Sequence, residues 1–206
     1  VLGPRINAGG RIGEAGLGLR LLLSRDPHEC ERISAVLDRL NGERQAMEHA
    51  ALEEAEARLL ALSGAGELPP VLQVAGGDWH PGVVGLVAAR LKERYRRPAL
   101  AVAVGPDGRG TGSGRSIPGV DLGAAVRAAV EAGVLEKGGG HAMAAGVTVA
   151  SGRLADLSAF LAERLADDVA RARHADALEV DGLLTAEAAG EELYALVERA
   201  GPYGSG

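Results

Sequence analysis

The sequence contains little cysteine and few aromatic residues. Its single cysteine, Cys30, excludes an internal disulfide framework, which fits a reducing compartment better than a secreted protein. One Trp, one Phe and three Tyr occur among 206 residues, so the core must be built from aliphatic side chains. So few rings also disfavour a nucleic-acid interface in which many bases stack on aromatic side chains.

Long apolar runs and a basic charge balance are missing as well. The longest runs, such as Pro98–Val104, fall far short of the roughly 18–20 residues that cross a bilayer. The opening VLGPRINAGGR does not resemble a secretory signal, so we expect a cytoplasmic protein with no membrane partner. A net charge of −6 disfavours a protein that coats nucleic acid through its overall field, and any anion site must be local.

No pattern of converging metal ligands or of a nucleophile with its base can be found. CxxC and HExxH motifs do not occur, and Asp78 with His80 would supply only two ligands to a metal ion. The other histidines of helical stretches, His28, His49 and His174, are expected in solvent. We therefore expect no catalytic centre within this chain. The missing initiator Met and the ending in the turn GPYGSG predict a fragment of a longer protein.

The first third of the sequence predicts helices. PRINAGGR is expected to be a loop because Pro and Gly punctuate it, and a helix is expected from about Glu14 to Ser24. Apolar residues then repeat at three- and four-residue steps from Pro27 to Leu62. One helix of that length spans about 50 Å, which is typical of a helix that bridges two bodies or pairs as a coiled coil.

The rest alternates between strand and helix patterns, which indicates an α/β domain after a boundary at Ser63–Pro70. Strands are expected at 71–76, 98–104 and 146–150, and helices at 81–95, 121–132 and 153–173, with Asp121 as a cap. GTGSGRSI (110–117) is expected to be an edge strand or a hairpin arm. Residues 177–184, with a helix at 185–200, are expected to begin a further domain.

The segment GSGRS, Gly112–Ser116, is a candidate phosphate site. Closely spaced glycines expose N–H groups, Ser113 and Ser116 add hydroxyls, and the guanidinium of Arg115 suits bidentate phosphate contact beside Gly114. The alternative is a glycine-rich hairpin with an exposed arginine. The glycine spacing does not follow a strand and open a helix, as a dinucleotide-binding fold requires.

A second candidate is GGGHAMAAG, Gly138–Gly146. Here Gly139 and Gly140 would let a bulky ligand approach closely, and His141 would donate to a phosphate or ribose. The alternative is a structural role, which is the commoner one for a solitary histidine beside glycines. A third is His80 before Pro81, where free N–H groups at a helix start favour an anion. The alternative there is that Asp78 caps the helix while His80 packs.

Together these motifs carry a family resemblance. PRINAGGRIGEA, LNGERQAME, HPGVVGLVAARLKERYRRPALAVAV, GSGRSIPGVDL and GGGHAMAAG resemble, in order and spacing, the RecJ family of bacterial single-strand-specific DNA exonucleases. The similarity is close over about 3–150 and weaker beyond, and GGGHAMAAG alone is shared by the wider DHH phosphoesterase superfamily.

The resemblance implies a domain plan for the chain. Residues 1–26, with Arg5, Asn7 and Arg11, would be the tail of a DHH domain, and 27–62 a long connecting helix. Residues 71–173 would form a DHH-associated domain with a mixed sheet flanked by helices, and 177–206 the start of an oligonucleotide-binding fold.

The same resemblance implies a 5′-to-3′ exonuclease of DNA repair and recombination that takes single-stranded DNA. Ser113, Arg115 and His141 would hold the 5′ phosphate. The Mn²⁺ or Mg²⁺ used by the family would be bound outside this chain, because the DHH motif does not occur in it. Two other functions stay open: a DHH phosphodiesterase for short oligoribonucleotides or cyclic dinucleotides, and a non-catalytic module that binds nucleotide ends.

Overall fold

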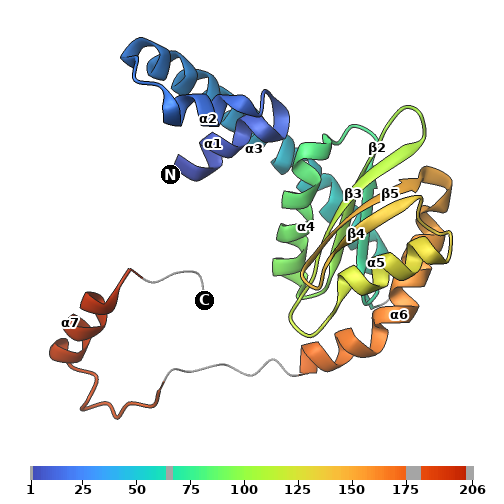
Figure 1. The fold of residues 1–206 in the computed structure, drawn as a ribbon. Coiled ribbons are helices and arrows are strands. Elements are labelled where there is room, and N and C mark those ends of the chain that lie inside the picture. The colour runs from blue at the N-terminus through green and yellow to red at the C-terminus, as the bar shows by residue number, and fades with distance from the viewer. Residues whose placement is uncertain (1, 64–66, 175–181, 203–206) are drawn as a thin grey trace. The chain divides into compact units, whose positions relative to one another are not determined.

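The structure is a computed structural model that describes residues 2–63, 67–174 and 182–202. It divides the chain into two units, residues 1–175 and 176–206. Figure 1 shows the first unit as a helical N-terminal part followed by a sheet with helices on its faces. The mixed α/β class expected from the sequence is confirmed.

Two short helices begin the chain: α1 (Leu2–Ile12) and α2 (Gly16–Leu23). The expected loop at PRINAGGR is therefore wrong, because this segment lies inside α1. The glycines here do not break the helix, and two of this region, Gly9 and Gly13, allow close packing on α3. A Cβ on Gly9 would lie 3.3 Å from Leu37 Cδ2, and one on Gly13, just past the helix end, 2.9 Å from Leu40 Cδ1.

Helix α3 (Pro27–Ser63) confirms the long helix expected from the apolar period. It is buried in two separate stretches. Ile33, Leu37 and Leu40 are buried in the half that packs on α1 and α2. In the second half, Ala51, Ala55 and Leu59 are buried against the α/β domain. One helix thus joins two packed bodies within the first unit.

The sheet has five strands in the order β1, β2, β3, β5, β4. They are β1 (Leu72–Gly76), β2 (Ala99–Val104), β3 (Arg109–Arg115), β4 (Lys137–His141) and β5 (Ala144–Ala150). β1 and β2 are parallel, and the other neighbours are antiparallel. β3 forms a hairpin with β2, as one expectation had it, but it is the central strand and not an edge strand.

Strand β4 was not expected, and it is the edge strand of this side of the sheet. Its sequence KGGGH has no apolar alternation, because most of its residues are exposed. Pairing with β5 through a two-residue turn, Ala142–Met143, makes it a strand. GGGHAMAAG is therefore a strand, a turn and the start of another strand.

Helices cover both faces of the sheet. On one face α4 (Pro81–Tyr95) packs on β2 and β3, and residues of α3 complete a core around Ala99, Ala101 and Ala103. On the other face α5 (Leu122–Glu131) and α6 (Leu154–His174) enclose a larger aliphatic core with Leu100 and Val102 (Figure 1). Asp121 caps α5 as expected, accepting from Ala124 N at 2.8 Å. A short 3₁₀ turn, η1 (Ser151–Arg153), precedes α6.

The second unit contains helix α7 (Glu191–Ala200), which matches part of the helix expected at 185–200. The rest of the expected oligonucleotide-binding fold stays a prediction, because residues 175–181 and 203–206 lie outside the described residues.

The glycines of β3 face the larger core at alternate positions. A Cβ on Gly112 would lie 2.7 Å from Val147 Cγ2 and 2.9 Å from Val102 Cγ2. A Cβ on Gly114 would lie 2.6 Å from Leu122 Cδ2. The core face of the central strand therefore has no room for side chains.

We predict that Gly112→Ala lowers the free energy of unfolding by about 1–3 kcal/mol, the range for overpacking a core. Urea unfolding of the variant and of Gly152→Ala checks this, because a Cβ on Gly152 meets nothing within 4 Å. Equal stability of the two variants would contradict the tight packing of β3.

Candidate phosphate-binding site

Sheet pairing places two of the sequence-predicted residues on one face of the sheet. Arg115 on β3 and His141 on β4 both pair with Ala144 of the strand between them. Residues that pair directly point to the same face, so Arg115 and His141 flank Ala144 about 10 Å apart. The next row on this face is Ser113, Gly146 and Gly139.

The guanidinium of Arg115 is held from one side. Its Nη1 donates to Ser113 Oγ and to Gly114 O, each at 2.8 Å. Because Ser113 Oγ accepts this bond, its own hydrogen remains to be donated elsewhere. Nη2 lies beside helix α4, where a Cβ on Gly85 would come within 3.0 Å of it. Arg115 therefore lies half-buried between β3 and α4.

A second arginine, Arg11 of α1, reaches the same region. Its Nη1 donates to Gly82 O at the start of α4, at 3.3 Å. Burial, and then the positive charge of Arg11, lower the pKa of Arg115 below its ordinary value. Among the described residues no carboxylate forms an ion pair with either arginine. Two neighbouring cations without a counter-ion favour an anionic ligand.

His80 and His141 each use the ring atom Nδ1 for a local hydrogen bond. His80 is the N-cap of α4, and its Nδ1 accepts from Gly82 N at 3.0 Å. Asp78 is therefore not the cap. His141 Nδ1 accepts from Met143 N at 3.3 Å. A neutral imidazole that accepts at Nδ1 carries its hydrogen on Nε2, so each ring keeps one donor for a ligand.

The remaining predicted site residues differ in whether they face the interior of the domain or open space. Ser116 is 1% exposed, and its hydroxyl donates to Val120 O at 2.8 Å, so the phosphate contact expected of it is wrong. Gly114 faces the core, and Gly140 has a φ of 153° that suits glycine alone. Gly139 differs from these, because a Cβ on it would meet nothing within 4 Å.

Sequence reasoning did not assign Arg11 or Gly85 to this site. Arg11 was expected to belong to the tail of a DHH domain, and Gly85 lies in the candidate segment around His80 without an expected role of its own. Their nearness to Arg115 arises from packing between segments that are far apart in the chain. The only signal in the sequence is Gly85 itself. A glycine in the interior of a helix costs about 1 kcal/mol of helix stability relative to alanine, so its presence there calls for a packing reason.

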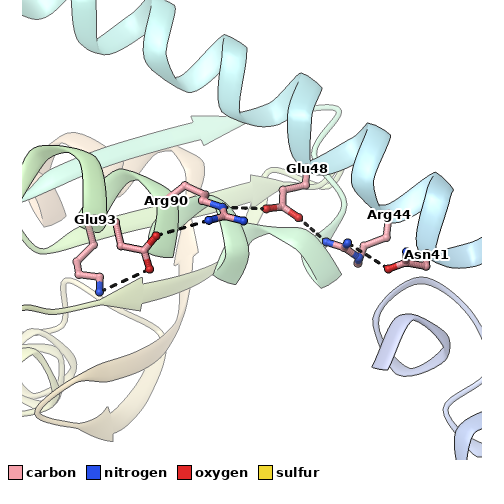
Figure 2. Close-up of polar contacts among 6 residues, drawn as sticks. Asn41, Arg44, Glu48, Arg90 and Glu93 are labelled. Atoms are coloured by element: carbon pink, nitrogen blue, oxygen red, sulfur yellow. Dashed lines mark hydrogen bonds and ion pairs between the residues drawn. The ribbon is translucent and has the colours of Figure 1, made fainter. Parts of the chain in front are cut away.

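A pocket of about 790 Å³ lies between α1, α3 and α4, and Arg11 is one of its lining residues. Its wall contains a chain of polar contacts, drawn in Figure 2. Arg44 donates to Asn41 and Glu48, Arg90 donates to Glu48 at 3.4 Å, and Arg90 pairs with Glu93 at 3.6 Å. Arg44 is 8% exposed, so Glu48 neutralises a buried charge and links α3 to α4.

We predict that Glu48→Ala lowers the free energy of unfolding by about 2–3 kcal/mol, because it leaves buried Arg44 without its carboxylate. Glu43→Ala is the matched control, since Glu43 forms an exposed pair with Arg39 on the same helix. That control should cost less than about 0.5 kcal/mol. Urea unfolding curves that fail to separate the two variants would contradict the proposed role of Glu48.

The described residues contain no group of three or more His, Cys, Asp or Glu that could hold a metal ion. The described residues therefore offer no set of ligands for the Mn²⁺ or Mg²⁺ that the family resemblance implies. No helix in the described part of the chain is long and apolar enough to span a membrane.

Comparison with known proteins finds a match to the α/β domain. Residues 69–167 match the DHHA1 domain, the DHH-associated domain that the motifs implied. They contain the whole sheet with helices α4 and α5 and most of α6. The α/β body that carries Arg115 and His141 is therefore similar to a DHHA1 domain.

The chain as a whole is similar to RecJ proteins. It is 35% identical over 206 residues to the single-stranded-DNA-specific exonuclease RecJ of Salmonella typhimurium, covering 98% of this chain and 36% of that protein. Over 151 residues it is 40% identical to RecJ of Escherichia coli, covering 72% of this chain and 26% of that protein. The chain thus spans about a third of the length of these relatives.

Solved structures agree with the sequence comparison. The crystal structure of RecJ from Thermus thermophilus in complex with Mg²⁺ matches with a TM-score of 0.68 and 34% identity, covering 81% of this chain and 25% of that one. A structure of exonuclease RecJ bound to manganese matches with a TM-score of 0.67 and 34% identity, covering 82% and 41%.

Proposed function

We propose that this chain is the strand-binding part of a metal-dependent exonuclease that degrades single-stranded DNA from its 5′ end in DNA repair and recombination. The observation that carries the proposal is that Arg11 and Arg115 lie near each other. Among the described residues, no carboxylate forms an ion pair with either of them. Similarity to RecJ along 98% of the chain supplies the substrate class.

In this proposal the site grips the terminal 5′ phosphate. Arg115 and Arg11 neutralise its charge, while Ser113 Oγ–H and His141 Nε2–H donate from the same sheet face. Holding the end of the strand at a fixed place sets which phosphodiester bond lies at the cleavage centre. His80, which keeps an Nε2 donor at the start of α4, would add a contact.

The cleavage chemistry belongs outside these 206 residues in our proposal. The related RecJ structures contain Mg²⁺ or Mn²⁺, whereas the described residues of this chain offer no cluster of ligands for such an ion. We therefore assign the metals to another domain of the whole exonuclease, and place that protein in the cytoplasm.

We predict that Arg115→Ala weakens binding of a 5′-phosphorylated single-stranded oligonucleotide by about 1–3 kcal/mol, the range for a lost charge-assisted contact. Binding of the 5′-hydroxyl strand should change little, because that strand lacks the group that Arg115 contacts. Fluorescence anisotropy with the 206-residue chain measures both affinities.

Arg153→Ala is the control for this experiment, because Arg153 is an exposed arginine paired with Asp156. It follows the end of β5 that is opposite to Ala144. Loss of a positive charge there should leave the 5′-phosphate preference intact. If the wild-type chain binds both strands equally or binds neither, or prefers dinucleotides to long strands, the proposed function is wrong.

The chain alone should not hydrolyse single-stranded DNA in the presence of Mn²⁺, since its described residues lack a metal-binding cluster. A radiolabelled-strand assay checks this, with the chain added at a large excess over substrate. Release of mononucleotides that increases with the amount of purified chain would place a catalytic centre within the chain. It would contradict our assignment of the metals to another domain.

A further inference from the structure

Helix α4 contains two glycines, Gly82 in its first turn and Gly85 one turn further on, that face the two site arginines. A glycine in the interior of a helix costs stability relative to alanine, so Gly85 calls for a packing reason. A Cβ on Gly82 would overlap the backbone oxygen of Arg11. A Cβ on Gly85 would lie 3.0 Å from Arg115 Nη2 and 3.1 Å from Ser113 Oγ.

The close contacts at Gly82 and Gly85 differ in the kind of atom that a Cβ would meet. At Gly82 the neighbour is backbone, so a side chain there would force α1 and α4 apart. At Gly85 the neighbours are side-chain atoms of Arg115 and Ser113, and these atoms would have to move by a few tenths of an ångström to admit a Cβ. A methyl group at Gly85 would therefore displace side chains of the site and would not meet backbone atoms first.

We propose that Gly85 is a positioning residue for Arg115 in the candidate phosphate-binding site. Arg115 is fixed on its Nη1 side by Ser113 and Gly114, and the bare Cα of Gly85 forms the wall on its Nη2 side. The guanidinium then has one orientation before any ligand arrives. This inference rests on the proposed function, because it assumes that Arg115 binds the 5′ phosphate.

Gly85→Ala tests the inference in the 206-residue chain. We expect about 3- to 10-fold weaker binding of the 5′-phosphorylated strand, unchanged binding of the 5′-hydroxyl strand, and a thermal midpoint no lower than that of the wild type. Gly42→Ala is the matched control, since Gly42 is an exposed helix glycine whose Cβ would meet nothing within 4 Å. It should leave both affinities unchanged.

A double-mutant cycle separates positioning from a general packing effect. In the Arg115→Ala background, Gly85→Ala should have no further effect on the 5′-phosphorylated strand, because the side chain it displaces is gone. An effect that persists there, an equal loss on both strands, or a lowered thermal midpoint would overturn the inference.

The failure of this inference differs from the failure of the proposed function. If Arg115→Ala leaves the 5′-phosphate preference unchanged, the proposed function fails and this inference with it. If Arg115→Ala abolishes the preference while Gly85→Ala leaves it intact, only the positioning role of Gly85 is overturned.

Discussion

The close packing of helix α4 is the constraint on which the rest of the structure depends. The helix contacts α1 at Gly82, the sheet at Gly85, and α3 through Arg90 and Glu48. Because glycine allows the first two contacts, arginines from both neighbours reach the same region. The candidate site is therefore a product of helix packing as much as of the two glycine-rich motifs on the sheet.

Much of the fold could be predicted from the sequence, where a pattern was long or a cap was strong. The apolar period gave α3 nearly to its end, and the Pro81 start and the Asp121 cap gave α4 and α5. α1 was missed because glycines break helices in isolation, whereas Gly9 of α1 packs against Leu37 of α3. β4 was missed because an exposed run of glycines carries no periodic signal.

The candidate site could be predicted in part. Ser113, Arg115 and His141 belong to recognisable motifs, and pairing through β5 explains why two short segments meet on one face. Arg11 and Gly85 could not be predicted, because their role exists only once α1, α4 and β3 are packed. Ser116 shows the opposite error, since a hydroxyl that suits phosphate by its chemistry is used inside the fold.

The length of α3 has a mechanical consequence. Ile33 and Leu59, buried at opposite ends, are 26 residues apart, which is about 39 Å along the helix axis. A tilt of only about 5° at one end would move the other end by roughly 3 Å over that length. Arg44, Glu48 and Arg90 form their contacts near the middle of α3. These contacts therefore help to fix the orientation of the N-terminal helices relative to the α/β domain.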